Sequence, residues 1–200
     1  MDLRMMIKKV KSRINEIDDT FVTPDNIIDF INDAQRDLTD VLRLEAEAEI
    51  DLVDGQEWYD LPEDLNKMER VEVDGFRYLQ RSKTHYLANK QKYFSEKKVY
   101  AFWDRRIYLY PTPDDEAEKL NLWYYRRPEE LEVDSDVPEI DEKYHRLLVD
   151  YAIAMCFEKD EEQGLFNQLM GRYEIKKQEM FMNTDVINED TSVIAKRWAW

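Results

Sequence analysis

The spacing of apolar residues changes twice along the chain and divides it into three predicted regions. Near both ends apolar residues recur every three to four positions, as on one face of a helix, whereas in the middle they alternate with polar residues, as in half-buried strands. The spacing predicts helices over residues 2–18, 24–44, 141–159 and 161–182. Between the two helical pairs, alternation over residues 47–133 predicts an antiparallel β-meander of roughly six short strands.

Turn and cap residues sharpen this outline. Thr23 and Pro24 suit the N-cap and first position of the second helix, and Asp54-Gly55 and Asp74-Gly75 are typical of hairpin turns. Beyond Asn183 the helical spacing stops, so we expect residues 184–200 to form an extended C-terminal arm. The predicted fold is α+β: a four-helix bundle with an inserted β-meander, forming a single domain over residues 1–183, followed by the arm.

Two of the predicted strands have an aliphatic face and an aromatic face. In the stretch "KLNLWYYRRP" (residues 119–128) the aromatic face holds Trp123 and Tyr125, and in "RIYLYP" (residues 106–111) it holds Tyr108 and Tyr110. Such a face suits a sheet covered on both sides, a contact with another protein, or a platform for stacking bases. Because Glu129, Glu130 and Glu132 follow closely and would repel phosphates, the first two interpretations are favoured.

Charge also argues against a nucleic-acid binder. The chain has 45 acidic and 29 basic residues and a formal net charge of −16, a field that repels nucleic acid unless the basic residues gather on one face. The first helix carries Lys8, Lys9, Lys11 and Arg13, which we interpret as a contact with an acidic protein surface. The chain's last residues include two tryptophans, typical interface anchors. The candidate interface residues are therefore Lys8, Lys11, Arg13, Trp123, Tyr125, Ile194, Arg197, Trp198 and Trp200.

Reactive residues are few. His85 and His145 are the only histidines, and the single cysteine, Cys156, lies in an apolar helix, where a buried thiol is the better interpretation than a nucleophile. The chain contains no phosphate-binding glycine loop and no G-x-S-x-G motif. We therefore expect no catalytic residues, no metal and no cofactor. The lack of a signal-like or membrane-length apolar stretch predicts a soluble protein made in the cytoplasm, with no membrane partner.

Several stretches, in this order, resemble the adaptor (head-to-tail connector) proteins of tailed bacteriophages. They are "IIDFINDAQRDL", "EWYDLPEDLNKMERVEVDG", "IYLYPTP", "LNLWYYRRPEEL" and "VPEIDEKYHRLLVDYAIAMCFEKD", within a similarity that spans roughly residues 3–183. The resemblance implies a helical bundle with an inserted β-region, assembled as a dodecameric ring beneath the portal.

The same resemblance implies what the ring does. It implies a virion protein, made in the host cytoplasm, that joins the portal to the tail or nozzle protein and lets DNA pass through its channel. The family has no catalytic residues that could be assigned to this chain. The resemblance also implies C-terminal segments that reach the portal or adjoining subunits. A nucleic-acid-binding regulatory or packaging protein is the alternative function.

Overall fold

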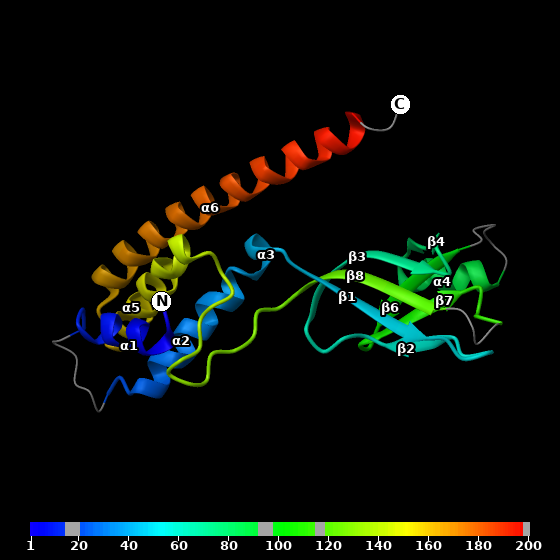
Figure 1. Ribbon diagram of the computed structural model, residues 1–200. Coiled ribbons are helices and arrows are strands. Elements are labelled where there is room, and N and C mark those ends of the chain that lie inside the picture. Colours follow the sequence, from blue (N-terminus) through cyan, green and yellow to red (C-terminus); the bar gives the residue numbers. More distant parts are fainter. Residues whose placement is uncertain (15–20, 92–97, 115–118, 198–200) are drawn as a thin grey trace. The chain divides into compact units, whose positions relative to one another are not determined.

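A computed structural model describes residues 1–14, 21–91, 98–114 and 119–197, with side chains up to residue 183. The chain divides into two compact units (Figure 1). The helical unit comprises Met1–Arg43 and Pro128–Trp200, and the sheet unit comprises Leu44–Arg127. Each unit is built around hydrophobic residues of its own.

The helical unit contains α1 (Leu3–Lys11), α2 (Pro24–Asp37), α3 (Thr39–Leu42), a 3₁₀ turn at Glu142–Tyr144, α5 (His145–Lys159) and α6 (Gln163–Arg197). Helix α2 begins as predicted, because Thr23 and Asn26 form a reciprocal capping box and Pro24 occupies the first turn. The core between these helices includes Leu3, Ile31, Leu148 and Tyr173, each fully buried.

Several predicted helix boundaries need correction. The second helix does not run to residue 44: α2 ends at Asp37, and the separate short helix α3 is terminated by Arg43 in the left-handed conformation (φ 47°). The first helix ends at Lys11, and its predicted continuation over residues 15–18 lies outside the described residues. The third starts as a 3₁₀ turn before α5, and Glu161 (φ 62°) makes the turn into α6.

The extended C-terminal arm is wrong as far as Arg197, because α6 continues without a break from Gln163 to that residue (Figure 1). Polar residues after Asn183 interrupt the apolar spacing from which the end of the helix was predicted. Extending an existing helix adds a hydrogen bond for each residue fixed, so a helix can propagate through a stretch that lacks an apolar stripe.

The sheet unit contains eight strands and one helix among its described residues. One sheet has the order β1-β8-β3-β4, formed by Leu44–Asp51, Lys119–Arg126, Leu65–Val73 and Phe76–Arg77. The other has the order β2-β7-β6-β5, formed by Trp58–Asp60, Arg106–Tyr110, Val99–Trp103 and Leu79–Gln80. Helix α4 is Lys83–Lys90. All strand pairs are antiparallel except β5 with β6.

The aliphatic faces of both sheets form one core. Ile107 and Leu109 of β7 join Leu120 and Leu122 of β8 in this cluster, and all four are fully buried. The aromatic face of β6 and β7 is covered within the unit by α4. There the Tyr86 ring makes edge contacts with the rings of Trp103 and Tyr108. The Trp103 and Tyr108 rings stack on each other, with their centroids 3.6 Å apart.

The described residues thus form six α-helices and two four-stranded sheets, so the predicted four-helix bundle with one inserted meander and an extended arm is wrong. The Asp74-Gly75 turn does join two paired strands, β3 and β4. The Asp54-Gly55 turn instead lies between β1 and β2, which belong to different sheets. Alternation identifies the faces of a strand but not its partners, and β8, the last strand in the chain, pairs with both β1 and β3.

Candidate functional site

Helix α1 places basic side chains on one surface because its other side is buried. Asp2 caps the helix by accepting the Met5 amide 2.8 Å away, and Leu3, Met6 and Val10 are fully buried. Arg4, Lys8, Lys9 and Arg13 are exposed, beside Met5 and Ser12, and no acidic residue occurs between Leu3 and Ile14. Together with Arg146 of α5, these residues form what we call the basic face: Arg4, Lys8, Lys9, Lys11, Arg13 and Arg146.

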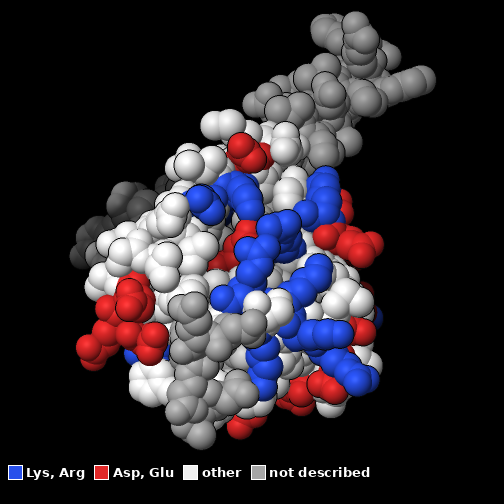
Figure 2. All heavy atoms as spheres, turned by 90° about the vertical axis from the view of Figure 1, so that its left-hand side faces the viewer, with Lys and Arg blue, Asp and Glu red and all other residues white. Residues whose placement is uncertain are grey.

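Lysine and arginine side chains gather on the side of the helical unit that Figure 2 faces. Positive side chains at the C-terminal turn of α1 also interact favourably with the negative end of the helix dipole. The predicted interface residues Lys8 and Arg13 are exposed on this face, and Lys11 is half-buried. In a chain of net charge −16, this local reversal of sign is the clearest electrostatic feature of the helical unit.

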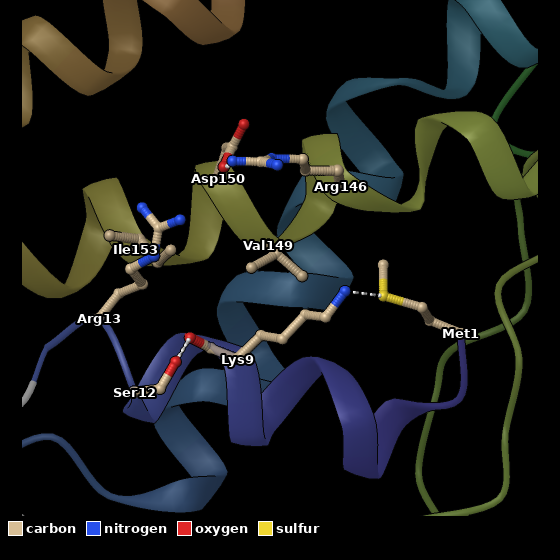
Figure 3. Close-up of a pocket in the computed structure, with 8 residues that line it drawn as sticks. All are labelled: Met1, Lys9, Ser12, Arg13, Arg146, Val149, Asp150 and Ile153. Carbon is tan, nitrogen blue, oxygen red and sulfur yellow. Dashed lines mark hydrogen bonds and ion pairs between the residues drawn. The ribbon is translucent and has the colours of Figure 1, made fainter.

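A cavity of about 220 Å³ opens between α1 and α5 (Figure 3). Lys9 and Arg13 line it from the α1 side and Arg146 from the α5 side, above an apolar floor of Val149 and Ile153. Asp150, also in the lining, is held by Lys176 at 2.6 Å and by Arg146 at 3.8 Å. Because Lys176 offsets the Asp150 carboxylate, the cavity retains a positive rim over an apolar base, which suits a carboxylate-bearing side chain.

The other predicted aromatic residues lie on the outer face of the first sheet. Trp123 and Tyr125 are half-buried there, and the Trp123 indole N–H donates to Glu47 Oε1 at 2.8 Å. The Arg70 guanidinium sits 5.0 Å from the centre of the Trp123 ring. Trp123 thus contacts an acidic and a basic residue of its own unit, which partly cover the ring.

Sequence reasoning missed the strongest feature of this face. In β1, Glu45, Glu47, Glu49 and Asp51 all point outward, while the alternate residues pack toward the core; we call these four the acidic row. Lys119 of β8 pairs with Glu49 and approaches Asp51 at 3.9 Å. The signal was present in the sequence as "LEAEAEID", where strict alternation places every carboxylate on one side of the strand.

The side chains of the C-terminal candidate residues are not described by the structure. Ile194 and Arg197 lie on the helical backbone of α6, with side chains outside the described set, and Trp198 and Trp200 lie outside the described residues altogether. The structure therefore brings Lys8, Lys11 and Arg13 together, places Trp123 and Tyr125 on a face of the sheet unit, and leaves the C-terminal group as a prediction.

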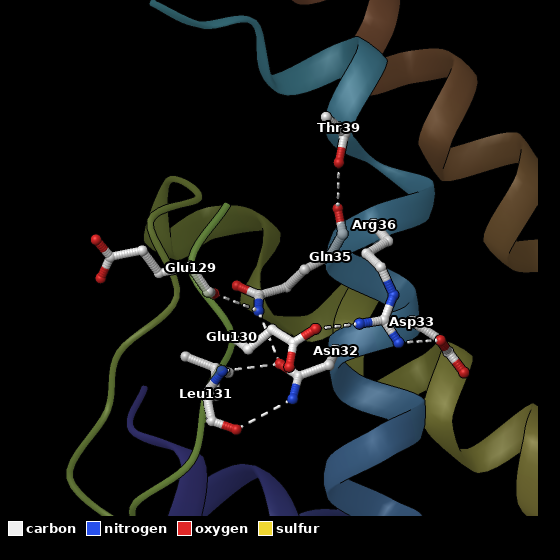
Figure 4. A network of polar contacts seen from close by, with 8 residues as sticks. All are labelled: Asn32, Asp33, Gln35, Arg36, Thr39, Glu129, Glu130 and Leu131. Atoms are coloured by element: carbon white, nitrogen blue, oxygen red, sulfur yellow. Dashed lines mark hydrogen bonds and ion pairs between the residues drawn. The ribbon is translucent and has the colours of Figure 1, made fainter. Parts of the chain in front are cut away.

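A second polar cluster in the helical unit is structural (Figure 4). The Asn32 amide donates to the Leu131 carbonyl at 3.0 Å and accepts the Leu131 amide at 2.9 Å, as a neighbouring strand would. Gln35 donates to Asn32 and to the Glu129 carbonyl, and Arg36 binds Glu130 at 2.6 Å. The cluster fixes the segment that follows the sheet unit against α2, so its buried polar groups have partners.

The groups that could act chemically are held in structural environments. Among the described residues no three His, Cys, Asp or Glu side chains converge as metal ligands would. Burial raises the pKa of the Cys156 thiol to about 12, which keeps it protonated. His145 is buried and its Nε2 donates to the Ile140 carbonyl at 2.8 Å. Burial and a hydrogen bond to Asp37 likewise raise the pKa of Tyr173.

The described residues thus carry two oppositely charged faces, one at α1 and α5 and one on β1. A model of the SU10 adaptor protein family matches residues 1–189, which includes the sheet unit and the helical unit up to residue 189. The chain therefore belongs to this family of phage head–tail adaptors, and the predicted family is confirmed. No curated protein matches the chain.

Family membership has direct consequences. The family is one of structural phage proteins, so the chain is a virion component that interacts with other virion proteins. Within the described residues, none of the helices has both the length and the apolar character needed to cross a bilayer.

Proposed function

We propose that the chain is one subunit of a ring that joins the phage portal to the tail and continues the channel through which DNA leaves. The observation that carries this proposal is the family match across residues 1–189, which covers the helical and the sheet unit alike. Its partners would be further copies of itself, in a dodecameric ring, the portal protein and a tail or nozzle protein.

The charge of the chain supports a passage for DNA rather than a binding site. A net charge of −16 per subunit, repeated around a ring, would repel phosphates along the channel wall, so that DNA slides without adhering. The basic face would be occupied by an acidic protein surface, on the portal or on a neighbouring subunit. The residues proposed for this contact from the helical unit are Lys8, Lys11 and Arg13.

Imaging of the purified chain with its cognate portal tests the proposal. We expect rings seated coaxially on the portal and no stable DNA complex at moderate salt. A chain that never joins the portal would contradict the adaptor role. Tight DNA binding whose affinity falls steeply with salt would instead support the alternative, a nucleic-acid-binding regulatory or packaging protein.

We also propose that the end of α6 and the residues after it contact another virion protein. Helix α6 carries Ile194 and Arg197 on its last turns, directly before Trp198 and Trp200. Tryptophan and arginine are the residue types most enriched among interface anchors. Deleting residues 194–200 is expected to weaken docking on the portal by tenfold or more, about 1.4 kcal/mol.

A second variant separates two effects of the deletion. Replacing Trp198 and Trp200 by alanine removes both anchors and leaves the helical backbone of α6 in place, so it separates the loss of indole contacts from the loss of chain. Full-affinity docking of the deletion variant, measured by surface-based binding to immobilised portal, would show that the segment is no anchor.

A further inference from the structure

We infer that the basic face of one copy binds the acidic row of a second copy. This inference rests on the proposed ring assembly and names the partner that occupies the basic face: the outer face of β1 and β8 on a neighbouring subunit. Both surfaces are exposed on the same chain, and they lie in different units. A contact between unlike surfaces is heterologous, and heterologous contacts are those that generate rings.

The two surfaces are complementary in sign. The basic face contains six basic side chains, and the stretch from Leu3 to Ile14 contains no acidic residue. The acidic row presents four carboxylates along one strand; Lys119 of β8 pairs with Glu49 and approaches Asp51, and Trp123 of β8 donates to Glu47. Because copies of net charge −16 repel one another over long distances, encounters that place the basic face against the acidic row are favoured over all other orientations.

The two surfaces are also complementary in spacing. Residues four apart on a helix, such as Arg4 and Lys8 of α1, are separated by about 6 Å along its axis. Outward residues two apart on a strand, such as Glu45 and Glu47, are separated by about 6.6 Å. Successive basic residues of α1 can therefore meet successive carboxylates of β1 when the helix lies along the strand. Both elements are regular, so the match does not depend on a loop adopting one conformation.

The cavity between α1 and α5 gives this contact a centre. Its rim carries Lys9, Arg13 and Arg146, and its floor of Val149 and Ile153 excludes water from one side. A glutamate side chain entering it would exchange water for charged donors in a partly enclosed site, where ion pairs are stronger than on an open surface. On the partner, the half-buried Trp123 beside Glu47 supplies an aromatic surface next to the carboxylates.

Phosphates of DNA are the competing occupant of a basic face, and the structure disfavours them. The basic face covers a single short helix and the edge of α5. Outside its six residues, acidic residues outnumber basic ones in the chain. The same chain supplies a row of carboxylates with matching spacing. DNA therefore enters the experiment as an outcome that would overturn the inference.

Two charge-reversal variants test the contact. Variant A carries Lys8→Glu and Arg13→Glu on the basic face, and variant B carries Glu45→Lys and Asp51→Lys on the acidic row. These positions are exposed, and variant B spares Glu47, which accepts the Trp123 hydrogen bond. Variant A lowers the charge of the basic face from +6 to +2, and variant B brings the charge of the acidic row from −4 to zero. Self-association at 50 mM salt, measured by sedimentation velocity, should therefore weaken by about tenfold or more in each variant alone.

Mixing the variants gives the decisive result. In an alternating assembly the two new glutamates of variant A face the two new lysines of variant B, and the unchanged basic face of B faces the unchanged acidic row of A. The equimolar mixture should therefore recover the association that each variant has lost. Arg105→Glu with Arg172→Glu is the control: it makes the same charge change as variant A at exposed positions outside both faces and should associate like the wild type.

Each other outcome overturns the inference. It fails if wild-type copies do not associate at low salt, if either variant associates like the control, or if the mixture does not recover. It also fails if variant A loses binding of a labelled 30-base-pair DNA while keeping self-association. Portal docking is measured separately by imaging, so a ring that still forms on the portal with variant A would reject this contact and leave the adaptor role standing.

Discussion

At the scale of single residues, Asn32 determines how the chain re-enters the helical unit. Its side-chain amide satisfies both backbone groups of Leu131, and the side chain is almost fully buried. Removing it leaves a buried N–H and a buried C=O without partners, each of which costs about 1–3 kcal/mol. We expect Asn32→Ala to lower the free energy of unfolding of the helical unit by about 2–3 kcal/mol.

A urea titration followed by circular dichroism at 222 nm measures this effect. Asn167→Ala on the exposed side of α6 is the matched control and should change the free energy of unfolding by less than about 0.5 kcal/mol. If Asn32→Ala changes the free energy of unfolding as little as Asn167→Ala does, water replaces the Asn32 amide, and its hydrogen bonds to Leu131 do not stabilise the helical unit.

Cys156 is a built-in reporter of whether the helical unit is folded. The thiol is fully buried, and burial raises its pKa to about 12, so about one thiol in ten thousand is ionised at pH 8. We expect reaction with a disulfide reagent at pH 8 to be at least about a thousandfold slower than for an unfolded control in urea. Fast reaction without urea would show that α5 opens locally far more often than its packing indicates.

At the scale of elements, the sequence predicts which side of a helix or strand is buried better than it predicts which elements pack against it. The spacing of Leu3, Met6 and Val10 correctly marks the buried side of α1, and the alternation through Leu120, Leu122 and Tyr124 correctly marks the buried side of β8. Both depend only on local periodicity. The pairing of β8 between β1 and β3 depends on contacts between residues some fifty to eighty positions apart, such as Val71 with Leu122 and Glu47 with Trp123, for which periodicity carries no information.

The same distinction applies to the candidate site. Lys8, Lys11 and Arg13 could be selected from the sequence because they are close along the chain, within one predicted helix, whereas Arg146 joins them only through the packing of α1 against α5. The aromatic strands were ambiguous for the same reason. Tyr108 is covered by α4, but Trp123, with an equivalent pattern, lies on the outer face beside Glu47.

Two glycines give opposite predictions that follow from their elements. Gly171 lies within α6 with no atom within 4 Å of an added Cβ, so Gly171→Ala should stabilise the helix by up to about 1 kcal/mol. Gly75 is equally open, but its φ of +73° in the β3–β4 turn is unfavourable for alanine, so Gly75→Ala should destabilise by about 1 kcal/mol. Urea titrations of the two variants should shift their midpoints in opposite directions, and a shift of the same sign would contradict one of the two conformations.

At the scale of the whole molecule, the chain crosses between its units twice, at Arg43–Leu44 and at Arg127–Pro128. The buried cluster that contains Cys156 is composed of residues of the helical unit, and the clusters around Leu122 and Tyr86 are composed of residues of the sheet unit. Each unit thus carries its own hydrophobic driving force for folding.

Probes for the two units are already in the chain, which makes the independence of the two cores testable. Trp58, Trp103 and Trp123 lie in the sheet unit and Cys156 in the helical unit. With Trp198 and Trp200 replaced by phenylalanine, tryptophan fluorescence reports the sheet unit and thiol reactivity the helical unit. Because Asn32 and Gly75 lie in different units, Asn32→Ala should lower the urea midpoint of thiol reactivity by about 1 M and leave the fluorescence midpoint unchanged, and Gly75→Ala should do the reverse. Equal shifts of both probes in both variants would mean that the two cores unfold as one cooperative structure.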